Sequence, residues 1–111
     1  MTDKRYVIDI AAGAARDLDD IHAYMADQRS IDDADALIDA LYQHMNTLTD
    51  FPLRGSRPPE MEMMGSRQVR QILHLPFRLI YHVVEGVVTI IIVADGRRDI
   101  SALLKQRLLG E

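Results

Sequence analysis

The longest apolar run in the chain, Val87 to Ala94, constrains the fold more than any other feature. It is apolar at positions that would face both sides of a strand, which is typical of a central strand covered on both faces. The run is far shorter than the ~20 residues that a helix needs to cross a bilayer. With no secretory signal pattern at the N-terminus and no cysteine in the sequence, we expect a soluble protein of the reducing cytoplasm.

Hydrophobic periodicity changes once in the first part of the chain. Residues 4–10 alternate between apolar and polar positions, which predicts a strand. From residue 11 to about residue 28 the apolar positions recur every three or four residues, which predicts an amphipathic helix. The side chains that share this stripe are Ala14, Leu18, Ile21 and Met25.

A second, longer helix follows a short turn. Ser30 with Asp33 three residues later has the form of a capping box, which marks the helix start. The helix must end near Phe51, because the residue before Pro52 is pushed out of the helical region. Residues 52–66, rich in proline and glycine, then predict a loop. The methionines of this loop either fill gaps in the core or form an adaptable surface.

Three strands and one helix complete the chain. Residues 68–75 and 77–84 have strand character, and Glu85-Gly86 predicts a tight turn into the strand at 87–94. Asp99 or Ser101 would cap a final helix. The order is β-α-α-β-β-β-α in one domain over residues 1–111. This predicts the α+β class, with the helical hairpin packed on one face of an antiparallel sheet.

Charge divides the chain into two halves. Residues 1–50 carry four Lys/Arg against eleven Asp, and residues 51–111 carry nine Lys/Arg against six Asp/Glu. An acidic half beside a basic half is typical of proteins with a charged partner, although the aspartates also suit the solvated faces of two helices. The pI of about 5.5 argues against a strongly basic nucleic-acid binder.

Several short segments follow one another in a distinctive order and spacing. They are Leu48-Thr49-Asp50-Phe51-Pro52, Gly55, Arg57, Gly65-Ser66-Arg67, Pro76-Phe77-Arg78-Leu79-Ile80-Tyr81 and Ile91-Ile92-Val93-Ala94-Asp95-Gly96-Arg97-Arg98-Asp99. With these segments the chain resembles the RelE/ParE superfamily of type II toxins from about Tyr6 to Leu108. The resemblance implies a small bacterial toxin that is neutralised by a cognate antitoxin of the ribbon-helix-helix, ParD-like kind, in a hetero-oligomer.

The superfamily has two main activities, RelE-like cleavage of mRNA on the ribosome and ParE-like poisoning of DNA gyrase. Metal-free RNA cleavage needs a base, an acid and cations that stabilise the transition-state charge. Here Arg67, Arg70 and Arg78 would be the phosphate clamps, and Tyr81 or His82 the acid–base group. Tyr81 also alternates with apolar neighbours, as a core tyrosine would.

The gyrase reading is favoured, because RelE-like nucleases commonly place a His–Tyr pair, a Tyr or an Arg near the C-terminus. This chain has no His or Tyr after His82. Asp95, where ParE-like sequences often carry His, departs from the ParE pattern. RelE-like cleavage of mRNA remains the alternative, and a degenerate member that retains only antitoxin binding is a third.

The resemblance also places the contact surfaces near the last strand and the last helix. Arg97-Arg98-Asp99 has an equally good reading as a plain turn that caps the last helix. The four histidines show no metal-ligand spacing, so we expect no metal and no cofactor. The expected target-binding residues are Arg97, Arg98, Leu104 and Arg107, and the expected antitoxin-binding residues are Arg78, Arg97, Arg98, Leu103 and Leu108.

Overall fold

The fold is known from a computed structural model that describes residues 5–63 and 68–110. Its element order confirms the predicted succession of strands and helices and the α+β class. The elements are β1 (Val7–Ile10), α1 (Ala12–Gln28), α2 (Ile31–Asn46), the 3-10 helices η1 (Thr47–Thr49) and η2 (Pro59–Met63), β2 (Val69–His74), β3 (Phe77–Val84), β4 (Val87–Asp95) and α3 (Ile100–Gly110).

The four strands form one sheet in the order β1-β4-β3-β2, so the long apolar strand is central, as predicted. β2, β3 and β4 are antiparallel neighbours. β1 runs parallel to β4, with Val7 opposite Val87 and Ile10 opposite Ile90, which makes the sheet mixed. The helical hairpin and two strands that separate β1 from β4 supply the long connection that a parallel pair requires.

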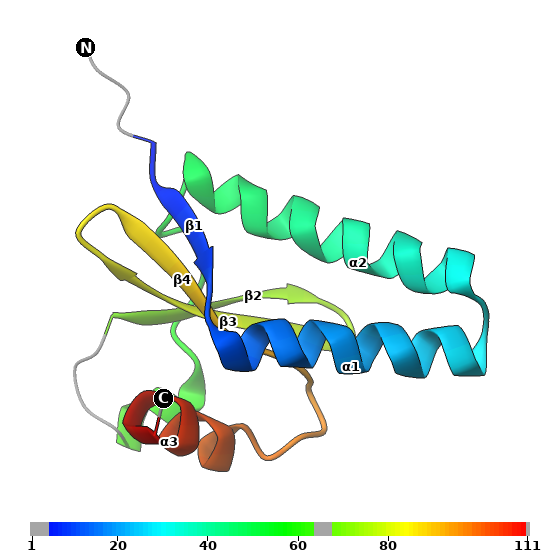
Figure 1. The fold of residues 1–111 in the computed structure, drawn as a ribbon. Helices are drawn as coiled ribbons and strands as arrows, with labels where there is room; N and C mark the ends of the chain where they lie inside the picture. Colours follow the sequence, from blue (N-terminus) through cyan, green and yellow to red (C-terminus); the bar gives the residue numbers. More distant parts are fainter. Residues whose placement is uncertain (1–4, 64–67, 111) are drawn as a thin grey trace.

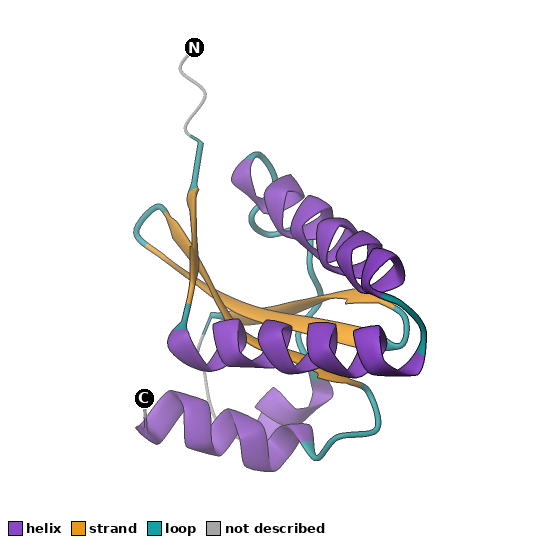
Figure 2. Ribbon diagram, turned by 45° about the vertical axis from the view of Figure 1, so that its right-hand side comes forward, coloured by secondary structure: helices purple, strands orange, loops and turns teal. Residues whose placement is uncertain are grey.

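Helices cover both faces of this sheet (Figures 1 and 2). On one face α1 and α2 bury Ala14, Leu18, Leu41 and Met45 against alternate residues of the strands. On the other face α3 packs over the second apolar side of β4. Each helix has one apolar stripe, so neither layer could bury its stripe without the sheet.

Local signals set several of the element boundaries. The Ser30 hydroxyl accepts a hydrogen bond from the backbone N–H of Asp33 at 3.0 Å, which confirms the predicted start of α2. α2 proper ends at Asn46, and η1 carries the helical path on to Thr49 before Pro52. At the β3–β4 turn both Glu85 and Gly86 have positive φ, as a two-residue hairpin turn of the favoured hand requires.

The loop after α2 contains more structure than its composition predicts. Pro59–Met63 forms a 3-10 helix, and Met61 is completely buried beneath the face that α3 covers.

Lys4, Met64, Gly65, Ser66 and Arg67 lie outside the described residues. Within the described ranges, no helix is long and apolar enough to span a bilayer.

Candidate functional site

The turn that follows β4 presents two arginines. Asp95, at the strand end, accepts hydrogen bonds from the backbone N–H of Arg97 at 2.9 Å and from its guanidinium Nη2 at 3.2 Å. These bonds hold the pKa of Asp95 below its usual value. The Arg97 side chain is still 90% exposed, and Arg98 beside it is also exposed. The turn therefore offers two cations to a partner.

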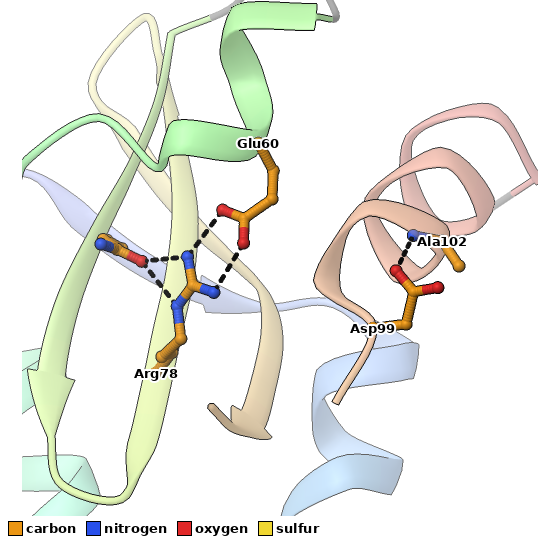
Figure 3. Close-up of polar contacts among 5 residues, drawn as sticks. Glu60, Arg78, Asp99 and Ala102 are labelled. Atoms are coloured by element: carbon orange, nitrogen blue, oxygen red, sulfur yellow. Dashed lines mark hydrogen bonds and ion pairs between the residues drawn. The ribbon is translucent and has the colours of Figure 1, made fainter. Parts of the chain in front are cut away.

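Asp99 connects this turn to the last helix. Its Oδ1 accepts the backbone N–H of Ala102 at 3.1 Å, so it acts as the predicted cap of α3 (Figure 3). The carbonyl of Asp99 also accepts the N–H of Leu103. The cap fixes where α3 begins relative to Arg97 and Arg98.

A pocket of about 500 Å³ adjoins the two arginines, between α1 and the ends of β3 and β4. Its walls are largely apolar, and Tyr24 of α1, 67% exposed, stands at its edge. Such a pocket suits the apolar anchor of a protein partner more than a polar substrate. Its lining comprises Asp17, Asp20, Ile21, Tyr24, Met25, Pro76, Phe77, Val93, Ala94, Asp95, Arg97 and Arg98.

Arg107 has a different role from the turn arginines. β1 pairs with β4 only as far as Ile90, so in the described sheet the rest of that edge lacks a neighbouring strand. The guanidinium of Arg107 donates to the carbonyl of Ile91 at 2.8 Å and to both oxygens of Asp17 at 2.9 Å. Asp17 in turn accepts the N–H of Val93 at 3.0 Å. This ion pair caps the open edge of β4 and ties α3 to α1.

The leucines expected at the contact surfaces lie mostly inside the protein. Leu104 is completely buried and Leu103 is 9% exposed, both against the sheet. Leu108 is half-buried and lines a second pocket, of about 600 Å³, on the α3 face. These side chains hold α3 in place, whereas Lys105, Gln106 and Leu109 form its exposed side.

Tyr81 is a core residue. It is completely buried, its hydroxyl donates to the carbonyl of Pro52 at 2.8 Å, and it accepts the N–H of Gly55 at 3.1 Å. Burial raises the pKa of Tyr81. A Cβ on Gly55 would lie 2.5 Å from the carbonyl oxygen of Gln71, so only glycine fits this approach. Tyr81 thus anchors the loop after α2 to the sheet.

Arg78 is held by an internal ion pair. Its guanidinium donates to both oxygens of Glu60, at 2.9 and 2.8 Å, and to the amide oxygen of Gln71 (Figure 3). These hydrogen bonds lower the pKa of Glu60. Only 14% of the Arg78 side chain is exposed. A phosphate or an antitoxin carboxylate would therefore have to displace Glu60.

The nuclease candidates divide between the two faces of the sheet, with Arg70 opposite Tyr81 on one face and Arg78 on the other. Arg70 donates to the carbonyl of Gly55 at 2.8 Å and so supports the same loop as Tyr81. His82 points to the same face as Arg78, opposite to Tyr81, and lines the pocket near Leu108. Arg67 lies outside the described residues.

Two histidines far apart in the sequence meet at the ends of α2 and β2. Nε2 of His44 and Nδ1 of His74 are 3.0 Å apart. Burial, the neighbouring His74 and the charge of Arg54 lower the pKa of His44. Among the described residues, no group of three or more His, Cys, Asp or Glu could hold a metal ion.

The sequence predicted the basic turn and the cap of α3, but it did not predict three side-chain pairs between distant residues. The pairs of Arg107 with Asp17, Arg78 with Glu60 and His44 with His74 join residues 90, 18 and 30 positions apart. No local period links such residues. The one available signal was the presence of long cationic side chains between apolar positions, which need a buried acceptor.

Comparison with known proteins agrees with this architecture. A solved structure described as the chromosomal ParDE toxin–antitoxin system from P. aeruginosa superposes with a TM-score of 0.69 at 16% identity, covering 83% of this chain and 97% of that one. The free E. coli toxin RelE, in a double arginine-to-alanine mutant, superposes with a TM-score of 0.59 at 16% identity, covering 94% and 95%. At this identity the two structures show a shared fold alone. No curated protein matches the chain by sequence.

The sequence itself matches a family model. Residues 8–100, from β1 to the first residue of α3, fit the model described as the ParE toxin of the type II toxin–antitoxin system parDE. The match includes both helices of the hairpin, the basic turn and the sheet except for its first residue, Val7. The chain therefore belongs to the ParE toxin family of type II toxin–antitoxin systems.

Proposed function

We propose that this ParE-family toxin inhibits DNA gyrase by binding it, without a catalytic step of its own, and that a ParD-like antitoxin neutralises it. The observation that supports the proposal is the contrast between two sets of arginines. Arg70 and Arg78 make internal contacts, whereas Arg97 and Arg98 are exposed beside an apolar pocket.

The hydrogen bonds and the ion pair that the candidate groups already make inside the protein argue against RNA cleavage by them. A general acid or base must reach the proton that it transfers, and the hydroxyl of Tyr81 is committed to Pro52 and Gly55 in the core. A phosphate clamp needs an available guanidinium, and Glu60 already neutralises Arg78. A surface that binds protein needs neither group.

For gyrase, the proposed contact surface is the turn at Arg97 and Arg98 together with the exposed side of α3. Leu104 and Arg107 would act indirectly, because they fix α3 against the sheet rather than reach a partner. The proposal places the protein in the cytoplasm, where gyrase and the chromosome are found.

For the antitoxin, we propose an acidic and apolar segment of a ribbon-helix-helix protein, in a hetero-oligomer with this chain. Carboxylates would meet Arg97 and Arg98, and apolar side chains would enter the neighbouring pocket. If the segment continues along α3, it would contact the half-buried Leu108, whereas Leu103 is buried against the sheet and would act only by holding α3 in place. Arg78 would join only if the antitoxin competes successfully with Glu60.

The discriminating experiment measures supercoiling by purified gyrase beside mRNA cleavage on translating ribosomes. We expect inhibited supercoiling and uncut mRNA. The double variant Arg97→Glu with Arg98→Glu should lose inhibition, whereas Arg29→Glu should keep it, because Arg29 is an exposed arginine at the distant α1–α2 turn. Tyr81→Phe and His82→Gln should also keep it, provided that circular dichroism shows a native fold.

Two outcomes would contradict the proposal. Codon-specific mRNA cuts with unaffected supercoiling would restore the RelE-like alternative, with Arg67, Arg70 and Arg78 as clamps and Tyr81 or His82 as the acid–base group. A folded protein that binds antitoxin but affects neither process would be a degenerate member of the family.

A further inference from the structure

Outside the proposed partner surface, His44 and His74 place one imidazole nitrogen of each ring next to the other. His44 lies in the last turn of α2, and His74 is the last residue of β2. Their ring centroids are 5.0 Å apart with an interplanar angle of 61°. The two nitrogens that point at each other, Nε2 of His44 and Nδ1 of His74, are 3.0 Å apart.

This spacing is close to that of two imidazoles on one metal ion. Zn²⁺ binds histidine nitrogen at about 2.0–2.1 Å in tetrahedral geometry, which separates two ligand nitrogens by about 3.3 Å. The rings would need to move apart by only about 0.3 Å. One of the two nitrogens now donates a hydrogen bond to the other. If that ring carries its proton on its other nitrogen instead, both facing nitrogens have free lone pairs, with no change in net protonation. Each ring would also have to turn so that its lone pair points at the ion, about 35° off the line between the two nitrogens in tetrahedral geometry.

The surrounding charges have opposing effects on a cation. The last carbonyls of α2 place the negative end of the helix dipole next to His44. Arg54, whose Nη1 bonds to the hydroxyl of Thr47, opposes a second positive charge at the same place. Metal binding requires the neutral form of both imidazoles, so it competes with protonation. We therefore expect modest affinity.

We propose that His44 and His74 are the two protein ligands of a site for a divalent transition metal that prefers imidazole, with water in the remaining coordination positions. The metal would link the end of α2 to the end of β2. Because the unfolded chain does not hold the two rings together, binding should stabilise the folded state. A metal concentration one hundred times the Kd should lower the unfolding equilibrium constant about 100-fold. This inference does not depend on the proposed function.

The test titrates Zn²⁺ into the untagged protein and follows it by calorimetry and thermal unfolding. We expect one site per chain and a Tm that rises with metal concentration. Loss of an outer-shell partner alone commonly weakens metal binding about 10- to 100-fold. Because His44 and His74 would bind the metal directly, His44→Gln and His74→Gln should each weaken Zn²⁺ binding by at least that factor. Arg54→Gln should bind more tightly. His22→Gln is the matched control, because His22 pairs with Asp35 across the helical hairpin instead.

A second measurement keeps the test independent of stability. The electron paramagnetic resonance spectrum of the Cu²⁺ form should show two coupled imidazole nitrogens in the wild type, and at most one in either histidine variant. The proposal fails if Zn²⁺ does not saturate a site, if both histidine variants bind as tightly as the wild type, or if only His22→Gln loses binding.

Discussion

The ion pair between Arg107 and Asp17 allows a quantitative test of how α3 is held. Arg107→Met keeps most of the aliphatic stem but removes two hydrogen bonds to Asp17 and one to the carbonyl of Ile91. The side chain of Asp17, only 11% exposed in the native structure, then keeps the N–H of Val93 as its remaining partner among these contacts.

Removing one partner of a buried pair typically costs 3–5 kcal/mol, because the other charge stays buried. We expect the lower end, about 3 kcal/mol, because Val93 still donates to Asp17. For a chain near 100 residues this corresponds to a fall in Tm of about 12 °C. Adding Asp17→Asn should restore part of the loss, because the amide oxygen still accepts the N–H of Val93 without a buried charge.

The assay is urea unfolding followed by circular dichroism, with thermal unfolding alongside. The control is Arg5→Met, which removes the pair with Asp50, where both side chains are more than half exposed. Exposed pairs contribute about 0–1 kcal/mol. The reasoning is refuted if Arg107→Met costs no more than Arg5→Met, or if adding Asp17→Asn destabilises the protein further.

Three more predictions concern single positions. Gly55→Ala should lower the free energy of unfolding by about 1–3 kcal/mol, since its Cβ would meet the carbonyl of Gln71, and an unchanged urea midpoint would contradict this. Arg78 lowers the pKa of Glu60, so the stabilisation from this pair is present above the pKa of an unfolded glutamate and is lost as the pH falls through the lowered value. The free energy of unfolding, measured in urea between about pH 6 and pH 3, should thus fall more steeply in the wild type than in Glu60→Gln. Equal slopes in the two proteins would be evidence against this role of the pair. Ser30→Ala should cost about 1 kcal/mol in thermal unfolding through loss of the α2 cap, whereas a wild-type Tm would argue that the cap is unimportant.

Local features of the sequence determined most of the elements. The cap at Ser30, the stop before Pro52 and the turn at Glu85-Gly86 each depend on residues within a few positions of one another. The central place of β4 followed from its apolar residues on both faces, because only a strand covered by two layers can bury them. The basic turn and its cap by Asp99 were visible for the same local reason.

The tertiary structure decided which distant residues meet. β1 pairs parallel to β4, a register that the alternation of residues 4–10 does not specify. Strand register and loop path then bring Arg107 to Asp17 and Tyr81 to the loop at Gly55. Hydrophobic periods of two and 3.6 residues indicate on which face of a strand or helix a side chain lies, but they do not indicate which distant residue it contacts. The partner depends on distances that exist only once the sheet and both helical layers have assembled.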